Sequence, residues 1–441
     1  MGKKSERGQV LIGVIILFTA AVMIIVLGVL SPTLRQLSIA SDFQASKQSY
    51  YTAEAGSEDA YYRIKKAITY SFPETLTLAS STATVTVTPT SFTEQQILSK
   101  GNNRNLIRSV IKYLTVGGGF DFSFAMQSGL GGIYLFNNAA VNGNIYSSGV
   151  IQGGNSNANS YNYVKGSIVS AGSTGLVDKI HATSTVYAHT ISNATIDQDA
   201  YYQTFNGATS SVTVSGTKHP NSPDQPALAM PVSDSLISDW ETDAASGGSV
   251  TCSGGTYTIS SSVSIGPKKI PCDLTISGNG TVVTLTGTLW VTGNISINGS
   301  GGSGVQMKVA DSIGDKSVSV IADKSSAQTT SGEITVNGNS NFYGSTGNAD
   351  SYVMLISMNK SAEQAGSELA INVVNGAAGN LLIYAPHGQI ELQNNVNMRE
   401  VTAYKLTLIN NTVVNYSIGL AQTLFTSGNG GAWKIKRWQE I

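Results

Sequence analysis

The chain has 441 residues, of which 47 are glycine and only 12% are charged, and its formal net charge is −1. A typical globular protein has about 25% charged residues, so this chain is poor in charge. Because it also lacks an excess of basic residues, we expect no nucleic-acid partner. Asparagine, serine, threonine and glycine replace the charged residues, and they favour turns and β-edges over helices.

A long uncharged apolar segment lies near the N-terminus. No charged residue occurs between Arg7 and Arg35, and residues 10–30 match the roughly 20 apolar residues with which a helix crosses a bilayer. Because Lys3 and Lys4 precede the segment, we expect a cytoplasmic N-terminus, a helix in the cell membrane and an extracellular remainder. A plain signal anchor and a cleaved secretory signal are alternatives, although a signal core usually spans only about 7–15 residues.

An amphipathic segment continues the apolar one. Over residues 34–70 the apolar side chains recur at helical spacing between charged residues, and Phe72 followed by Pro73 is expected to end the helix. The sequence therefore predicts one helix over residues 9–72. Its first half would lie in the membrane, and its second half would have one apolar face.

The residues around the start of the apolar segment resemble a known signal. Residues 3–9 (KKSERGQ) are similar to the type IV pilin signal, which is cut after the glycine that precedes the apolar helix. The resemblance implies a leader of residues 1–8, processing between Gly8 and Gln9, and association with other pilin-like subunits. Gly13 stands at the fifth mature position, where major pilins have a glutamate, and this departure suits a tip subunit or a non-polymerising protein.

The second half of the expected helix carries a further resemblance. Residues 47–63 (KQSYYTAEAGSEDAYYR) are similar to the N-terminal helix of PilX-type minor pilins, which also lack that glutamate. The family resemblance therefore implies a minor pilin at the cell membrane, with the type IV pilus as its assembly.

A small β-region is expected between the helix and the rest of the chain, over residues 73–119. Alternation over residues 75–88 predicts a hairpin, and residues 106–116 predict a further strand that ends at a run of glycines. The residues that follow, 120–441, form the predicted ectodomain.

Asparagine corners recur through this ectodomain at separations close to 19 residues or twice that value. Short alternating strands lie between the corners, a pattern typical of the coils of a β-solenoid. We therefore predict a mainly β protein whose ectodomain is a right-handed β-solenoid (β-helix), with an antiparallel sandwich as the alternative. The asparagines expected to stack in hydrogen-bonded ladders are Asn279, Asn298, Asn337, Asn375, Asn394 and Asn410.

Two further expectations follow from the repeat. Asn359 lies outside its phase and is expected to tolerate alanine, whereas Asn394→Ala should be costly. Residues 197–249 hold the densest proline cluster and a short helical pattern, so we expect them to form an excursion that covers the solenoid.

The C-terminal part resembles domains of bacterial envelope proteins. Residues 382–408 are similar to a coil of Gly/Asn-rich domains that are joined to PilX-type N-termini, and residues 433–440 (WKIKRWQE) are similar to their ending. These motifs are structural, so the resemblance implies an architecture and no activity.

The two cysteines, Cys252 and Cys272, lie 20 positions apart in the extracellular part. An oxidising environment favours a disulfide between them, and two buried free thiols are the alternative. A zinc site needs about four cysteine or histidine ligands. The four histidines are scattered along the sequence, so we expect no metal and no cofactor.

A secreted or anchored β-helix enzyme that acts on polysaccharide is an alternative function, because pectate lyases share this architecture. Glycoside hydrolysis needs two carboxylates about 5–10 Å apart. Asp273, Asp311 and Asp350 recur only at about two steps of the repeat, and no pair of carboxylates, Glu333 included, recurs at a single 19-residue step. We therefore expect no catalytic residues and no enzyme, and we interpret His387 as a surface turn residue.

The expected flat faces of the repeat carry tyrosines, namely Tyr146, Tyr161, Tyr163, Tyr343 and Tyr352. Such faces could bind polysaccharide or the surface of a host or partner cell weakly. Many copies along a filament would raise the overall avidity. The sequence thus predicts a minor pilin or adhesin that presents a β-solenoid for attachment or pilus assembly. A polysaccharide-acting enzyme and a structural envelope protein outside any pilus are the alternatives.

Overall fold

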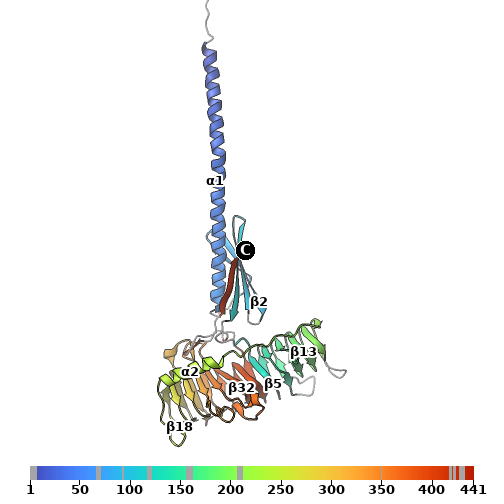
Figure 1. Cartoon of the computed structure of the whole chain (residues 1–441), viewed down its shortest axis with the longest axis vertical. Coiled ribbons are helices and arrows are strands. Elements are labelled where there is room, and N and C mark those ends of the chain that lie inside the picture. Colours follow the sequence, from blue (N-terminus) through green and yellow to red (C-terminus); the bar gives the residue numbers. More distant parts are fainter. Residues whose placement is uncertain are drawn as a thin grey trace, which may run out of the picture. The chain divides into compact units, whose positions relative to one another are not determined.

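The computed structural model divides into two units, residues Met1–Thr115 with Lys434–Ile441 and residues Val116–Trp433, and each is described by itself. The fold is mainly β with one long N-terminal apolar helix, as the sequence predicts (Figure 1). The residues that the structure describes are 7–65, 71–91, 94–116, 122–154, 162–205, 212–348, 350–416, 420, 424–426 and 433–441.

The first unit begins with α1 (Arg7–Lys65), a helix of 59 residues that includes Pro32. A proline inside a helix cannot donate a backbone hydrogen bond. One turn is instead supported by the hydroxyl of Thr33, which donates to the carbonyl oxygen of Val29 (2.7 Å). The sequence predicts a helix to residue 72, but residues 71–73 are not helical in the structure, and residues 66–70 lie outside the described residues.

Among the described residues, five strands form the sheet of the first unit, in the order β1-β2-β3-β4-β37. They are β1 (Glu74–Leu78), β2 (Ser81–Ser91), β3 (Glu94–Asn103), β4 (Leu106–Val116) and β37 (Trp433–Glu440). Strands β1 to β4 pair as successive antiparallel neighbours. The expected β-region therefore exists, but β3 was not predicted, because Ile97 and Leu98 are adjacent apolar residues and give it no alternation.

The last strand of the chain belongs to this first unit. The sequence analysis assigns residues 433–440 to the end of the ectodomain, but the structure places them beside β4. There the amide of Ile441 donates to the carbonyl oxygen of Ser109 (3.0 Å), and the guanidinium of Arg437 lies 3.8 Å from the ring centre of Tyr113. The second unit is consequently an insertion between β4 and β37.

The second unit is a stack of parallel strands. Its described strand pairs are all parallel, and among the described residues they form a sheet of 12 strands and a larger sheet of 20 strands. The 12-stranded sheet contains, in spatial order, β16 (Thr213–Val214), β14 (Thr195–Ile196), β12 (Ile180–Ala182), β9 (Asn162–Val164), β6 (Ala140–Asn142), β35 (Val413–Asn415), β33 (Asn397–Met398), β31 (Ala378–Gly379), β28 (Asn341–Tyr343), β25 (Val305–Val309), β22 (Thr281–Leu285) and β19 (Val263–Ile265).

The larger sheet contains the other described strands of the second unit. A coil is defined here by pairing: strands β10, β11 and β12 form one coil, because they pair with β7, β8 and β9 of the pass before. Long strands such as β32 take part in two pairing registers along their length, which joins the two sides into one sheet. Its strands are β5 (Met126–Leu135), β7 (Ile145–Ser147), β8 (Ile151–Gly153), β10 (Ile168–Ser170), β11 (Leu176–Asp178), β13 (Val186–Ser192), β15 (Ala200–Phe205), β17 (Lys218–Pro220), β18 (Thr256–Ile259), β20 (Lys268–Ile270), β21 (Asp273–Gly278), β23 (Leu289–Val291), β24 (Ile295–Gly299), β26 (Lys316–Ala322), β27 (Ile334–Asn337), β29 (Val353–Ser357), β30 (Leu369–Val374), β32 (Leu381–Gln393), β34 (Glu400–Ile409) and β36 (Leu424–Phe425).

The chain enters and leaves this stack in its middle. From β6 it runs outward to β16, and after a connection it starts again at β19 and runs inward to β35. The last and first coils then pair in register, Val413 with Ala140 and Val401 with Met126. Because both ends of the unit lie on neighbouring coils, the unit can be inserted between two strands of another sheet.

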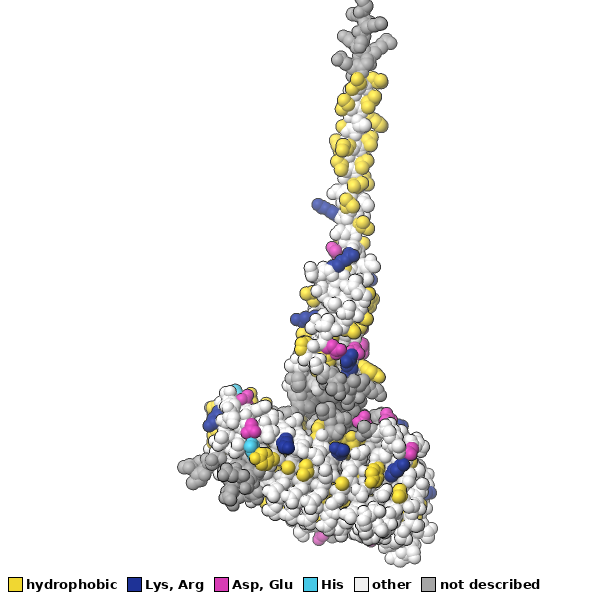
Figure 2. Space-filling model, turned by 180° about the vertical axis from the view of Figure 1, so that it is seen from behind, with side chains coloured by type: hydrophobic (Ala, Val, Ile, Leu, Met, Phe, Trp, Pro, Cys, Tyr) yellow, Lys and Arg dark blue, Asp and Glu magenta, His cyan; other side chains and the backbone are white. Residues whose placement is uncertain are grey.

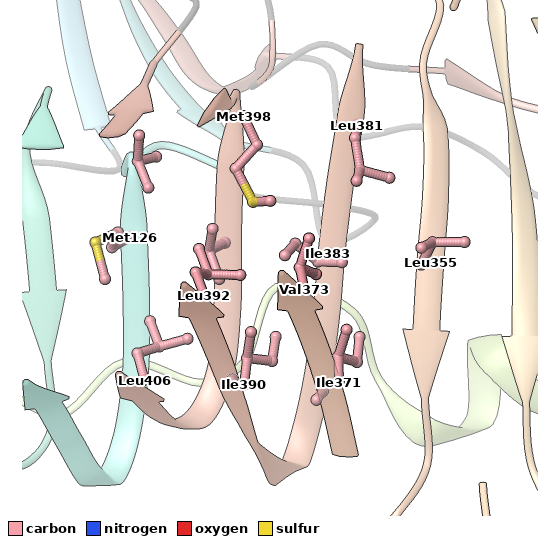
Figure 3. Packing of buried hydrophobic residues seen from close by; sticks show 14 of the residues in the cluster. Met126, Leu355, Ile371, Val373, Leu381, Ile383, Ile390, Leu392, Met398 and Leu406 are labelled. Carbon is pink, nitrogen blue, oxygen red and sulfur yellow. The ribbon is translucent and has the colours of Figure 1, made fainter. Parts of the chain in front are cut away.

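Aliphatic side chains stack inside the coils, because parallel strands in register place equivalent positions on top of one another. Figure 3 shows part of this core, with Met126 on the strand beside that of Leu406. One continuous inward row consists of Ile276, Ile297, Val336, Val373, Leu392, Leu408 and Leu135, all fully buried. Each coil buries its apolar face only against its neighbours, so the stack depends on its continuity.

A connecting segment covers one side of the stack, but it begins later than the sequence predicts. The expected excursion was residues 197–249, yet β15, β16 and β17 lie within the stack. The strap, defined here as residues 221–233, then crosses the coils and leads into α2 (Asp234–Ser246). Three prolines of the cluster, Pro223, Pro226 and Pro231, do lie in the strap. The predicted start was too early, because short strands such as β16 and β17 leave almost no alternation to recognise.

Side chains beneath the strap and α2 form a second, smaller core. The hydroxyl of Tyr146 donates to the carbonyl oxygen of Pro226 (2.7 Å). The hydroxyl of Tyr384 donates to the carbonyl oxygen of Val232 (2.5 Å). Trp240 of α2 is fully buried, and its ring centre lies 5.1 Å from that of Phe425. These contacts fix the covering segment on the outer face of the larger sheet.

Candidate functional site

The N-terminal half of α1 is the part of the first unit that suits a membrane. Large apolar side chains from Leu11 to Leu30 are exposed around the helix, and hydrophobic side chains cover it in Figure 2. Among the described residues, α1 is the one helix long and apolar enough to cross a bilayer. The predicted processing residues Gly8 and Gln9 lie in its first turn, while leader residues 1–6 lie outside the described residues.

Small residues let the second half of α1 lie directly on the sheet. Ala53 is fully buried, and a Cβ added at Gly56 would lie 2.8 Å from the Val85 side chain. A Cβ at Gly101 of β3 would lie only 1.9 Å from the backbone oxygen of Ser49. The residues that resemble PilX-type pilins at this point therefore have a packing role, because larger side chains would push the helix off the sheet.

One charged residue is buried at this packing surface. Lys112 of β4 is 2% exposed, and its ammonium group donates to the carboxylate of Glu58 on α1 (2.5 Å). A buried charge is tolerated only when it is paired. The pair therefore fixes which face of α1 contacts the sheet.

Asparagine side chains join successive coils of the second unit. The amide of Asn375 donates to Asn337 (3.0 Å), Asn394 to Asn375 (3.3 Å) and Asn410 to Asn394 (3.0 Å). Asn137 of the first coil then donates to Asn410 (2.9 Å), which the sequence analysis missed. The row thus crosses the place where the last coil meets the first.

These corners also require an unusual backbone. Asn375, Asn394, Asn410 and Asn137 have φ values of 62°, 60°, 56° and 49°, which lie in the left-handed region. Asparagine tolerates this region better than other residues that carry a Cβ. The corner asparagines therefore serve both the turn and the ladder.

Two predicted members do not belong to the row. The amide of Asn298 donates to Ser296 of its own strand (2.7 Å), and Asn279 accepts from the backbone amide of Ser303 (3.1 Å). A second short row was not predicted. In this row the side-chain amide of Asn415 donates to the side-chain oxygen of Asn397 (2.9 Å). The side-chain oxygen of Asn415 accepts from the side-chain amide of Asn142.

Asn359 behaves opposite to the expectation that it tolerates alanine. It is fully buried, its amide donates to the carbonyl oxygen of Ser331 (3.0 Å), and its side-chain oxygen accepts from the backbone amide of Ser361 (2.9 Å). A position outside the repeat phase can thus join two connecting segments, those that contain Ser331 and Ser361. Asn394 is only partly buried, so the loss of its side-chain hydrogen bonds should cost less.

We expect Asn359→Ala to lower the free energy of unfolding by about 2–3 kcal/mol, because two buried backbone groups lose their partners. Asn394→Ala should cost only about 1 kcal/mol, mainly from placing alanine in the left-handed region. Urea unfolding of the two variants measures the difference. A larger loss for Asn394→Ala would contradict this order.

A polar hollow of about 500 Å³ lies beside the disulfide of the second unit. The structure contains the Cys252–Cys272 bond, and Cys272 lines the hollow together with Asp323. The ammonium group of Lys269 lies 3.8 Å from the ring centre of Trp290, so one face of this indole is already covered.

Two carboxylates, Asp273 and Asp323, line this hollow. Glu241 of α2 is hydrogen-bonded to Asp323. Burial, followed by the charge and the hydrogen bond of Asp323, raises the pKa of Glu241 to about 8. Asp323 is therefore already paired with a carboxyl group that does not line the hollow.

The raised pKa of Glu241 predicts a pH-dependent stability. Its ordinary value is 4.5 and its folded value about 8, so between these values the folded chain binds a proton that the unfolded chain releases. The free energy of unfolding should therefore be highest below the unfolded pKa and fall as pH rises through the folded one. Glu241→Gln should flatten this slope in urea unfolding from pH 5 to 8, whereas Asp239→Asn, on the exposed side of α2, should leave it unchanged.

The carboxylates considered in the sequence analysis are scattered. Asp273 accepts from the backbone amide of Asn294 (2.8 Å), and Asp350 is exposed. Hydrogen bonds from Thr346 hold the pKa of Asp311 below its usual value.

Two further carboxyl groups have elevated pKa values. Burial and the neighbouring Glu368 raise the pKa of Glu333. Burial alone raises that of Glu400 well above its ordinary value. Glu400 is fully buried and accepts from the hydroxyl of Thr402, so it is enclosed in the fold and not open to a ligand.

His387 links three segments. Its Nδ1 lies 2.6 Å from Glu363 and its Nε2 lies 2.9 Å from Asp234 at the start of α2. The sequence analysis interprets it as a surface turn residue, whereas its ring is mostly covered and fastens α2 to the stack. Among the described residues, no group of three or more His, Cys, Asp or Glu side chains has the arrangement of a metal site.

The predicted tyrosines divide into two groups. Tyr146 and Tyr352 are buried, so they take part in packing. Tyr163 and Tyr343 are each 45% exposed on the 12-stranded sheet, and Tyr161 lies outside the described residues. Of the four predicted tyrosines that the structure describes, Tyr163 and Tyr343 are the ones open to a ligand.

A second hollow, of about 600 Å³, surrounds one of the exposed tyrosines. Its lining includes Tyr343, Gln306 and Lys308, together with Asn380 and the segment 344–348. Aromatic, amide and ammonium groups can together hold a polar ligand of small size. The sequence signal was the tyrosine alone, because the other lining residues come from coils far apart in the chain.

Comparisons with known proteins give little guidance. No protein-family model matches the sequence, and no curated protein matches it. The competence-associated pilin ComZ from Thermus thermophilus is a structural match with 11% sequence identity and a TM-score of 0.38, over 90% of this chain and 97% of that one. Values this low do not establish a shared fold.

Proposed function

We propose that this chain is a pilin-like surface protein, held in the cell membrane by the first half of α1, that acts as a minor pilin or adhesin. One observation carries the proposal. The helix leaves apolar side chains exposed on all sides over its first half and buries small side chains against an antiparallel sheet over its second half. A helix segment with apolar side chains on all sides is stable in lipid. A segment that packs on a sheet with one face belongs to a folded domain in water.

The orientation follows from charge. Lys3, Lys4 and Arg7 precede the apolar half, so the N-terminus would stay in the cytoplasm and the second unit would lie outside the cell. The extracellular position agrees with the disulfide between Cys252 and Cys272, since such bonds persist in oxidising surroundings.

We also propose that the second unit is a β-solenoid, and that its coils are right-handed. Parallel pairing in register over 12 strands of one sheet, with asparagine rows along the corners, supports the solenoid. The right-handed sense is carried over from the sequence prediction of a β-helix.

Association with other pilin-like subunits would use the part of α1 beyond the membrane. Leu37, Phe43, Tyr51 and Tyr62 are all more than half exposed there, and they offer apolar surface to neighbouring helices. The glycine at position 13 in place of glutamate favours a minor subunit. A structural envelope protein outside any pilus has the same anchor, and an enzyme would need a pair of open carboxylates.

The processing step tests the proposal. Gly8→Leu should block cleavage before Gln9, so the full chain should stay in the membrane fraction and disappear from filaments sheared off the cell surface. Gly13→Ala, which keeps the apolar segment, should be processed like the wild type. Normal cleavage of the Gly8→Leu chain would contradict the pilin-like signal, and normal cleavage without sheared filaments would favour an envelope protein.

A further inference from the structure

The hollow around Tyr343 has a floor built from neighbouring coils. Strand β25 contributes Gln306 and Lys308, and the next strand of the sheet, β28, contributes Tyr343, which is paired in register with Lys308. Asn380 follows β31 one coil further on. Side chains that are far apart in the sequence therefore point at one surface.

The wall of the hollow is held in place by hydrogen bonds of its own. The backbone amide of Thr346 donates to Asp311 (2.8 Å), and the amide group of Asn348 donates to the Ser345 hydroxyl (2.8 Å). The Ser345 hydroxyl in turn donates to the carbonyl oxygen of Gly314. A wall fixed before binding lowers the entropic cost of holding a ligand.

The polar groups in the hollow are suited to an uncharged ligand. The ammonium group of Lys308 lies 3.3 Å from Asp311, so its charge is largely compensated. The side chains of Gln306, Tyr343 and Asn380 form no hydrogen bond with another described residue. Hydroxyl groups of a ligand could therefore pair with these amides and with the phenol.

We propose that this hollow binds one pyranose unit of a neutral polysaccharide, with Tyr343 as the platform for the sugar ring and Gln306 and Asn380 as partners of its hydroxyl groups. The inference deepens the proposed function, because it names the polymer to which a surface-displayed second unit would attach. A single hollow of this kind binds weakly, and many copies along a surface would raise the avidity. Nucleic acid is disfavoured, because the one lysine of the hollow is already paired.

The test uses the full chain in detergent micelles and measures retardation in gels that contain dextran, galactomannan or arabinoxylan, with a (dT)20 oligonucleotide in a separate titration. We expect at least one polysaccharide to retard the wild type. Tyr343→Ala should weaken that binding by about tenfold, which is typical of truncating an aromatic anchor. Gln306→Ala should weaken it less.

Tyr163→Ala is the matched control, because Tyr163 is equally exposed on the same sheet but packs against the ring of His181. Its binding should equal that of the wild type, and all variants should unfold at the wild-type temperature. No retardation by any of the three polymers, equal losses for the two tyrosine variants, or tighter binding of the oligonucleotide would overturn the inference. None of these outcomes affects cleavage before Gln9, so the proposed function is tested separately.

Discussion

Replacing Gly101 by valine is expected to detach α1 from the sheet of the first unit. A Cβ at this position would lie 1.9 Å from the backbone oxygen of Ser49 and 2.9 Å from the backbone nitrogen of Ala53, both on α1. Backbone atoms cannot turn away as a flexible side chain can, so the whole helix must shift. We expect a loss of about 3 kcal/mol or more in the free energy of unfolding of this unit.

Limited proteolysis of the full chain in detergent measures this effect, because a detached helix exposes the face of α1 that is buried between Ala45 and Ile64. Gly28→Ala is the control, since nothing lies within 4 Å of a Cβ at Gly28. It should keep the wild-type resistance. A Gly101→Val chain as resistant as the wild type would show that the close contact between α1 and β3 does not exist.

Truncation of Trp240 to alanine is expected to have a similar effect on the second unit. The indole is fully buried, stacks on Phe425 and belongs to the apolar cluster between α2 and the outer face of the larger sheet. Removing a buried tryptophan typically costs about 3–5 kcal/mol. The strap and α2 should therefore become cleavable by protease within residues 221–249, while the coils stay folded.

The exposed neighbour Asp239 provides the control for this change. Asp239→Ala should leave both the cleavage pattern and the urea midpoint close to those of the wild type. If Trp240→Ala left the strap protected, then α2 would not be fastened by this cluster, and the hydrogen bonds of Tyr146 and Tyr384 to the strap would have to suffice.

Local patterns of the sequence account for the parts of the fold that were predicted. The apolar half of α1 and the asparagine corners are visible in windows of about 20 residues, because helices and coils repeat over such distances. Asn337, Asn375, Asn394 and Asn410 lie in consecutive corners, and the structure joins them by hydrogen bonds.

Contacts between distant segments account for what was missed. Asn137 bonds to a residue 273 positions away, because the chain begins and ends in the middle of the stack. The pairing of β37 with β4 has the same cause, since both ends of the inserted unit come out together. No spacing along the sequence carries information about such pairs.

The candidate binding site was predictable only in part. Tyr343 was visible as a tyrosine of the repeat, but the wall of its hollow comes from a segment inserted between two strands, and its floor comes from three coils. The sequence also did not show that Tyr146 and Tyr352 are buried whereas Tyr163 and Tyr343 are exposed. Side-chain exposure depends on the covering strap, whose path the sequence does not reveal.

The central claim is that α1 is the N-terminal helix of a processed, pilin-like surface protein. The most direct measurement is the N-terminal sequence, by mass spectrometry, of the chain recovered from the cell surface. The account predicts that the surface chain begins at Gln9 and retains the apolar half of α1. A surface chain that begins at Met1, or one that begins beyond Leu30, would contradict it.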